Sequence, residues 1–148
     1  MDVILNGDGN SNPCPYFTTA TSGTIAYADM IRLWSNLSPY QLNVVLAPTS
    51  AMTKILALSE MKDAVAGLNF HSTGKMITPL GANLIHTSAI TSDAVIGLDK
   101  TCALEMVKAG EVTTEYDKLI DRQLERAAIT CIAGFATIFT GASYKMTY

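Results

Sequence analysis

A short apolar run between two segments of helical periodicity constrains the fold most. The run covers residues 42–47 (LNVVLA), and Pro48 ends it. Short β-branched runs that end at a proline are typical of buried strands. A buried strand needs other strands beside it and helices over it. The run therefore predicts an α+β fold in which a mixed sheet is flanked by two helices.

Both neighbouring segments have the spacing of a helix. Before the run, apolar residues recur three and four positions apart, and Ser38 and Pro39 end the pattern, which predicts an amphipathic helix. The apolar stripe of this first helix is Tyr27, Met30, Ile31, Trp34 and Leu37. After the run, Thr49 or Ser50 can cap a second helix over residues 51–64. Its inward residues are expected to be Met52, Ile55, Leu56 and Met61.

The rest of the sequence predicts several short strands, and its C-terminal third has a pattern that fits both helix and strand. Strands are expected at residues 75–78, 83–87, 94–98 and 102–107, with a turn at 79–81. From residue 119 on, apolar residues keep a helical period, yet many are β-branched and alternate. We predict helical or irregular structure through Arg126 and a strand from Ala128.

Charge is low for a chain of this length. Charged residues make up 16% of the 148 residues and hydrophobic residues 49%, against about 25% charged in an average globular protein. The 10 basic residues are scattered and outnumbered by 13 acidic ones, so specific nucleic-acid recognition is not expected. The apolar excess instead suggests burial against other subunits or against further chain.

The three cysteines, Cys14, Cys102 and Cys131, are odd in number and lack a C-x-x-C spacing, which predicts reduced thiols. Cys102 and Cys131 lie among apolar residues and are predicted to be small buried hydrophobes. The sequence begins with no recognisable secretion signal, and no apolar stretch reaches the roughly 18 residues of a membrane span. Neither secretion nor membrane spanning is expected.

The opening segment NGDGNSNPCPY, residues 6–16, raises the question of a calcium loop. Asp8, Asn10 and Asn12 occupy the first, third and fifth positions of such a loop. Pro13 stands where the turn glycine is needed, and Thr19 stands where a bidentate glutamate should close the site. The segment is therefore predicted to be a turn in which Gly7 and Gly9 serve the backbone geometry.

Other candidate sites fail on spacing. Residues 72–75 (STGK) resemble part of a phosphate loop, but Asn69 stands in place of the first glycine and Met76 in place of the Ser or Thr that follows the lysine. His71 and His86 have no third ligand at metal spacing.

A nucleophile, base and acid could be chosen from Cys14, His86 and Asp93, but no flanking signature supports that choice. We therefore predict no catalytic, cofactor-binding or metal-binding residues, no cofactor and no enzymatic activity. A charged cluster between residues 115 and 126 is expected to be a solvated face or a contact between subunits. It comprises Glu115, Asp117, Lys118, Asp121, Arg122, Glu125 and Arg126.

Taken in order, several stretches resemble the C-terminal half of a tailed-bacteriophage major capsid protein of the Hong Kong phage type, whose fold encapsulin shells also use. They are residues 4–9 (ILNGDG), the helix at 25–37, 44–49 (VVLAPT) with its helix to 63, 94–100 (AVIGLDK), 103–106 (ALEM), and 121–126 (DRQLER) leading to 134–136 (GFA). No single stretch is decisive, and the succession carries the resemblance.

The resemblance implies an axial-domain-like region at residues 1–100, followed at 101–148 by returning strands and a helix of the peripheral domain. The N-terminal arm, extended loop and spine helix of that family would precede this chain, so we expect a fragment or a shortened form. It also implies a function without an active site, namely an icosahedral phage or prophage shell in the virion, built in the host cytoplasm by self-contacts at five-fold and six-fold axes, with other head proteins as further partners.

Two alternatives stay open. One is an encapsulin-like compartment shell, which keeps the fold but encloses a different cargo. The other, from a different class, is a small calcium-binding or hydrolytic domain that uses the opening segment.

Overall fold

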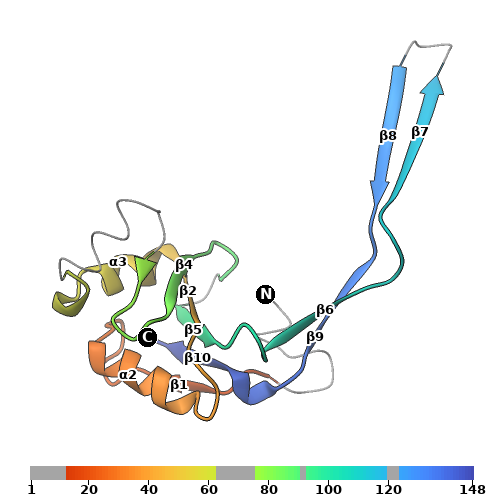
Figure 1. The fold of residues 1–148 in the computed structure, drawn as a ribbon. Helices are drawn as coiled ribbons and strands as arrows, with labels where there is room; N and C mark the ends of the chain where they lie inside the picture. The colour runs from red at the N-terminus through yellow and green to blue at the C-terminus, as the bar shows by residue number, and fades with distance from the viewer. Residues whose placement is uncertain (1–12, 63–75, 91–92, 120–123) are drawn as a thin grey trace.

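The computed structural model describes residues 13–62, 76–90, 93–119 and 124–148. They form a body, from which a long two-stranded arm extends into solvent (Figure 1). The body contains β1 (Tyr16–Thr18), α2 (Tyr27–Asn36), β2 (Val44–Ala47), α3 (Thr49–Leu56), the 3-10 helix η1 (Ser59–Met61), β3 (Met76–Ile77), β4 (Asn83–His86), β5 (Ala94–Leu98), the 3-10 helix η2 (Thr140–Ala142) and β10 (Ser143–Thr147). The arm contains β6 (Leu104–Lys108), β7 (Thr113–Leu119), β8 (Leu124–Thr130) and β9 (Ala133–Thr137).

The body is built on a six-stranded mixed sheet with the order β1-β10-β5-β2-β4-β3. β1 runs parallel to β10 and β2 runs parallel to β4, while the remaining neighbours are antiparallel. All five residues of β5 are buried, because both faces of this central strand are covered. The predicted strands at 42–47, 83–87 and 94–98 and the turn at 79–81 are confirmed, and so is the α+β class.

Both helices pack on one face of the sheet. Met30 and Leu33 of α2 and Ile55 of α3 lie in one buried cluster with side chains from β2, β4, β5 and β10. The sheet contributes Val45, Leu84, Val95 and Met146 to this cluster. α2 begins where the backbone N–H of Ala26 donates to the Asp29 carboxylate at 3.0 Å, which satisfies one of the free donors of the first turn.

A smaller cluster covers part of the opposite face. Ala94, Ile96 and Leu98 of β5 alternate with Val95 and Gly97, so they point to this second side. They pack with Val44, Ile90, Ala103 and Ala142, and Tyr40, Cys102 and Leu104 lie against the cluster. The residues at which the arm begins are therefore part of a core.

The apolar stripe predicted for the first helix is only partly correct. Met30 and Leu37 are buried, but Ile31 is 43% exposed and Trp34 is 52% exposed. Leu33, which lay outside the stripe, is fully buried in the structure. The buried face of α2 is thus rotated from the predicted one, because the sheet contacts positions 30, 33 and 37.

Helical structure through Arg126 is the main wrong prediction. Residues 101–119 and 124–148 contain β6–β10 and one 3-10 turn, with no α-helix among these described residues. β7 and β8 pair antiparallel from Thr113↔Thr130 to Leu119↔Leu124. Opposite charges that are spaced three and four apart in the sequence therefore lie on a hairpin.

The sequence division at residue 100 falls just after β5, where the chain leaves the sheet. After the arm, β10 returns and lies between β1 and β5. Residues 101–148 therefore supply one strand of the body as well as the whole arm.

Gly97 offers a test of the helix–sheet packing. A Cβ added to Gly97 would lie 2.8 Å from Leu42 Cδ1 and 3.1 Å from Leu33 Cγ. Gly97→Ala should lower the free energy of unfolding by about 1–3 kcal/mol, because a packed core does not yield freely to added atoms. Urea unfolding of the purified chain measures this change.

Gly134→Ala in the arm is the matched control, since nothing lies within 4 Å of its added Cβ. It should change the free energy of unfolding by less than about 0.5 kcal/mol. Equal effects of the two substitutions would contradict the close packing of α2 on β5.

Candidate self-association surface

The arm consists of two antiparallel ribbons in succession. β6 pairs with β9 from Leu104↔Thr137 to Lys108↔Ala133, and β7 pairs with β8 farther out. The backbone N–H of Ala109 donates to the carbonyl of Ile132 at 3.0 Å, which joins the two ribbons. Nearly all described side chains of these four strands are exposed. The arm therefore has two open faces along most of its length.

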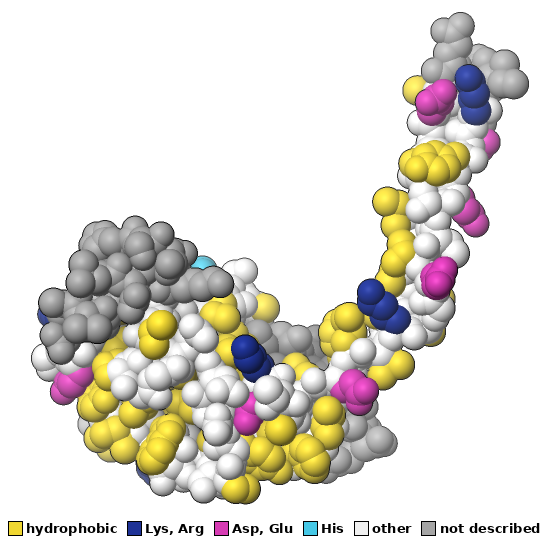
Figure 2. All heavy atoms as spheres, viewed as in Figure 1, with side chains coloured by type: hydrophobic (Ala, Val, Ile, Leu, Met, Phe, Trp, Pro, Cys, Tyr) yellow, Lys and Arg dark blue, Asp and Glu magenta, His cyan; other side chains and the backbone are white. Residues whose placement is uncertain are grey.

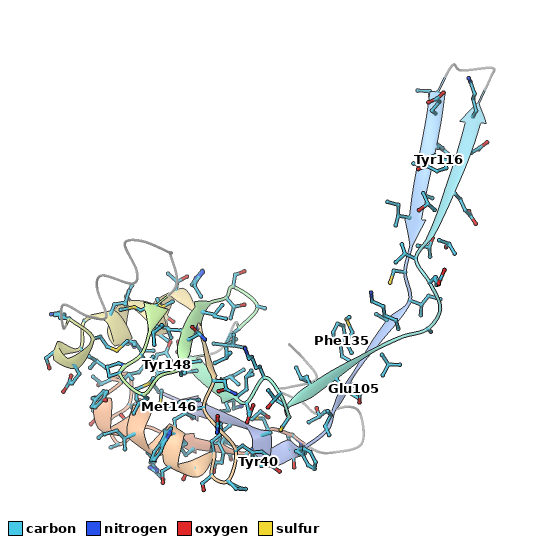
Figure 3. All side chains as sticks on the ribbon, in the orientation of Figure 1. Tyr40, Glu105, Tyr116, Phe135, Met146 and Tyr148 are labelled. Atoms are coloured by element: carbon cyan, nitrogen blue, oxygen red, sulfur yellow. The ribbon has the colours of Figure 1, made fainter. Side chains whose placement is uncertain are left out.

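One face of the β7–β8 hairpin carries large apolar side chains next to the Lys118–Glu125 pair. Thr114 lies opposite Ile129, and Tyr116 lies opposite Ala127, so these four residues share one face of the ribbon. Tyr116 is 81% exposed and Ile129 is 72% exposed. Figure 3 shows Tyr116 far from the body, so its exposure does not depend on the fold of the body.

Apolar exposure continues along the inner ribbon. Met106 and Phe135 are a cross-strand pair, and each is more than half exposed. Figure 2 shows hydrophobic side chains along one side of the arm and most of its acidic side chains along the other. The exposed large hydrophobic residues of the arm are Met106, Val107, Val112, Tyr116, Leu124, Ile129, Ile132 and Phe135. We call these eight residues the arm patch.

The described members of the charged cluster, Glu115, Asp117, Lys118, Glu125 and Arg126, lie on the hairpin. Lys118 Nζ lies 3.6 Å from Glu125 Oε1 across the two strands, and both side chains are exposed. Glu115, Asp117 and Arg126 share the face opposite to Tyr116. Exposed ion pairs of this kind contribute about 0–1 kcal/mol to stability. The ion pair therefore adds little to the stability of the arm, which depends mainly on the backbone hydrogen bonds between its strands.

Asp99 connects the body to the start of the arm. Asp99 is 5% exposed, and its carboxylate accepts four hydrogen bonds. The donors are the backbone N–H of Gln41 at 3.0 Å, Asn43 Nδ2 at 2.8 Å, and the backbone N–H and hydroxyl of Thr101 at 3.0 and 2.6 Å. The Thr101 hydroxyl lowers the pKa of Asp99 most; burial opposes this, but the other donors add to it, and the pKa stays below its ordinary value of 3.8.

The residues considered as a catalytic set do not form one. Cys14 is buried, and this burial raises the pKa of its thiol, which disfavours the reactive thiolate. His86 Nε2 lies 2.8 Å from the Thr49 hydroxyl. No hydrogen bond in the described part of the chain joins Cys14, His86 and Asp93. A surface depression of about 540 Å³ beside Trp34, Tyr40 and Leu80 is lined by no Asp, Glu, His, Lys or Cys.

The two cysteines predicted to be buried differ from each other. Cys102 is half-buried against the second apolar cluster, but Cys131 is exposed on the arm. The prediction for Cys131 is wrong because its apolar neighbours in sequence lie on a ribbon and not in a core.

Several candidate residues lie outside the described residues. They are Asp8, Asn10, Asn12, Gly7 and Gly9 of the opening segment, the segment 69–75 with His71, and two members of the charged cluster, Asp121 and Arg122. Within the described ranges, no group of three or more His, Cys, Asp or Glu side chains is placed to hold a metal ion. Within the same ranges, no helix has the length and apolar character needed to cross a membrane.

Comparison with models of known protein families finds no match, and neither does comparison with curated proteins. Solved structures do match. The chain superposes on the structure of Mycobacterium phage Che8 with a TM-score of 0.67 and 12% identity, over 90% of this chain and 53% of that one. It superposes on the capsid of an empty GTA particle with a TM-score of 0.65 and 12% identity, over 99% of this chain and 60% of that one.

A virus-like particle from Pyrococcus furiosus also matches, with a TM-score of 0.58 and 14% identity, over 90% of this chain and 56% of that one. The chain has the capsid-protein fold. The fold resemblance stated from the sequence is thereby confirmed. The chain spans between 53% and 60% of the length of these three structures.

The capsid fold of this chain includes the arm as well as the body. Since the match to the GTA particle capsid covers 99% of the chain, both parts align within one fold. At identities of 10–14%, the likeness concerns the fold, and function has to be argued from the surface.

The Asp99 carboxylate makes a pH-dependent prediction. Because its pKa is lowered on folding, ionised Asp99 stabilises the fold above the unfolded pKa of about 3.9, and this contribution is lost as the pH falls through the folded value. Asp99→Asn should cost about 1–3 kcal/mol at neutral pH, since a buried donor loses its acceptor. Urea unfolding at neutral pH and near pH 3 should show that the difference in free energy of unfolding between wild type and variant becomes smaller in acid.

Asp93→Asn is the matched control, because Asp93 is exposed at the opposite end of β5. It should leave stability at neutral pH nearly unchanged. If the free energies of unfolding of wild type and Asp99→Asn differ by the same amount at both pH values, the role of the ionised carboxylate is contradicted.

Proposed function

We propose that the protein is a shell subunit that acts by repeated contact with further copies of itself. The observation that carries this proposal is the arm patch, a series of large apolar side chains exposed on a ribbon over whose faces the described residues place no layer. An isolated two-stranded ribbon is at best marginally stable in water. A contact with other subunits would cover the patch and stabilise the ribbon at the same time.

The energetics favour a contact that uses several residues of the patch. Full burial of one Ile, Phe or Met side chain contributes about 1.5–3 kcal/mol, whereas association costs about 4–15 kcal/mol. One or two buried side chains would not hold subunits together, so the contact has to cover several residues of the arm patch. The low charge of the chain supports the same conclusion.

In its specific form, the proposal is a major capsid subunit of a tailed phage or prophage. The capsid fold and its likeness to the structures of Mycobacterium phage Che8 and of the GTA particle capsid support it. The subunits would form an icosahedral shell with contacts around five-fold and six-fold axes, assembled in the host cytoplasm and present in the virion. Other head proteins would be further partners. Such a subunit needs no catalytic residue, cofactor or metal ion.

A compartment shell is the second candidate. The match to a virus-like particle from Pyrococcus furiosus favours it, because that structure shares the fold at a similar level of identity. The genes next to the one that encodes this protein would distinguish the two candidate functions. Portal, protease and terminase genes indicate a phage head, whereas a peroxidase or ferritin-like gene indicates a compartment.

Ile129→Glu tests the contact. Ile129 is 72% exposed, so the substitution should change the free energy of unfolding by less than about 0.5 kcal/mol. Assembly should be lost, because a carboxylate would be buried without a partner at the contact. Sedimentation velocity and electron microscopy of the full chain measure assembly.

Thr130→Glu is the matched control, because Thr130 is also exposed, is the next residue of β8, and points to the other face of the ribbon. It should assemble like the wild type. Assembly that is equally intact in both variants would remove the arm from the contact, and a wild-type chain that stays monomeric at high concentration would contradict the proposed function.

A further inference from the structure

The arm joins the body through two short segments. The outgoing root, residues 99–103, leads from β5 to β6, and the returning root, residues 138–142, leads from β9 to β10. A single loop of the body, residues 38–43 between α2 and β2, contacts both roots. We call it the 38–43 loop.

The 38–43 loop binds the outgoing root through Asp99. Gln41 N–H and Asn43 Nδ2 donate to the two oxygens of the carboxylate at 3.0 and 2.8 Å. Thr101 donates twice to one of these oxygens, and the backbone N–H groups of Cys102 and Ala103 donate to the Asp99 carbonyl at 3.2 and 2.9 Å. The buried Asp99 thereby links the loop to the last residues before β6.

The same loop packs on the returning root through Tyr40. The Tyr40 and Phe139 rings lie 5.9 Å apart with an interplanar angle of 32°. A Cβ on Gly141 would lie 3.3 Å from Tyr40 Cε2, so glycine at this position lets the ring approach closely. Figure 3 shows Tyr40 on the body below the roots and Tyr116 far out on the arm.

The two roots are also bonded to each other. Asp99 N–H donates to the Ala142 carbonyl at 2.9 Å, and Ile138 N–H donates to the Ala103 carbonyl at 3.3 Å. Tyr40 and Cys102 pack on the second apolar cluster. Beyond Leu104, by contrast, every described side chain of β6 is exposed. The contacts that can fix the direction of the arm are therefore concentrated at the roots.

We propose that Asp99 and Tyr40 are positioning residues that set the direction of the arm relative to the body. Because the arm is long, a small change in its direction at the roots moves its tip by a large distance. At about 3.3 Å per residue, the strands from residue 104 to 119 extend roughly 50 Å, so a rotation of about 10° at the roots moves the tip by about 9 Å. If the protein is the shell subunit proposed above, the roots also set the angle between neighbouring subunits.

A distance measurement between two spin labels tests the proposal. One label is placed on Cys131 of the arm and one on a cysteine introduced at the exposed Thr53 of α3, with Cys14 and Cys102 replaced in every variant. Excess unlabelled chain suppresses distances between copies. Pulsed electron resonance should show one narrow distance peak for the wild-type roots. Asp99→Asn and Tyr40→Ala should each lose that narrow peak, while Asp93→Asn should keep it.

The distance peak separates positioning from a general loss of stability. If Asp99→Asn fails to fold, Thr101→Val keeps the buried carboxylate, removes one donor, and should still broaden the peak. A broad peak for the wild type, or a narrow peak at an unchanged distance in Asp99→Asn and Tyr40→Ala, would overturn the proposal. A narrow wild-type peak in a chain that forms no shell would instead contradict the proposed function and leave the role of the roots intact.

Discussion

A two-stranded ribbon has two faces and no layer to cover either of them. In this protein the ribbon carries eight large hydrophobic residues that remain about half exposed or more, although hydrophobic side chains elsewhere fill two cores. Their burial requires a surface that the described chain does not provide. The proposed function, and the importance of the direction of the arm, both depend on this constraint.

The body provides the rigid support that an exposed arm needs. β5 is covered on both faces, and the residue that follows it, Asp99, accepts four hydrogen bonds at the start of the arm. β10 returns the chain to the centre of the same sheet, beside β5. Both ends of the arm are thus attached to the most buried part of the fold. A force on the arm would therefore act on the sheet.

The body and part of the arm could be predicted from the sequence, since β6 lies at the strand expected over 102–107 and β8 and β9 include the strand expected from Ala128, but the β7–β8 hairpin could not. Residues 42–47 and 94–98 have the β-branched composition of buried strands, and tertiary packing agrees with that preference. In the arm, Lys118 and Glu125 lie seven positions apart, which fits two helical turns as well as a pair across a hairpin. The face of α2 was also ambiguous, because Leu33 and Trp34 are both large and apolar, and only contact with the sheet decides which is buried. The arm patch was visible only as an excess of apolar residues.

Hydrogen exchange of the arm amides tests the central claim most directly. The exchange of residues 104–137 is compared between a dilute chain and the same chain at a concentration at which it associates. The outer edges of β7 and β8 should exchange slowly in the associated state and fast in the dilute state, while β5 should exchange slowly in both. Fast exchange of the arm in an associated state would show that other surfaces make the contact and would contradict a contact through the arm.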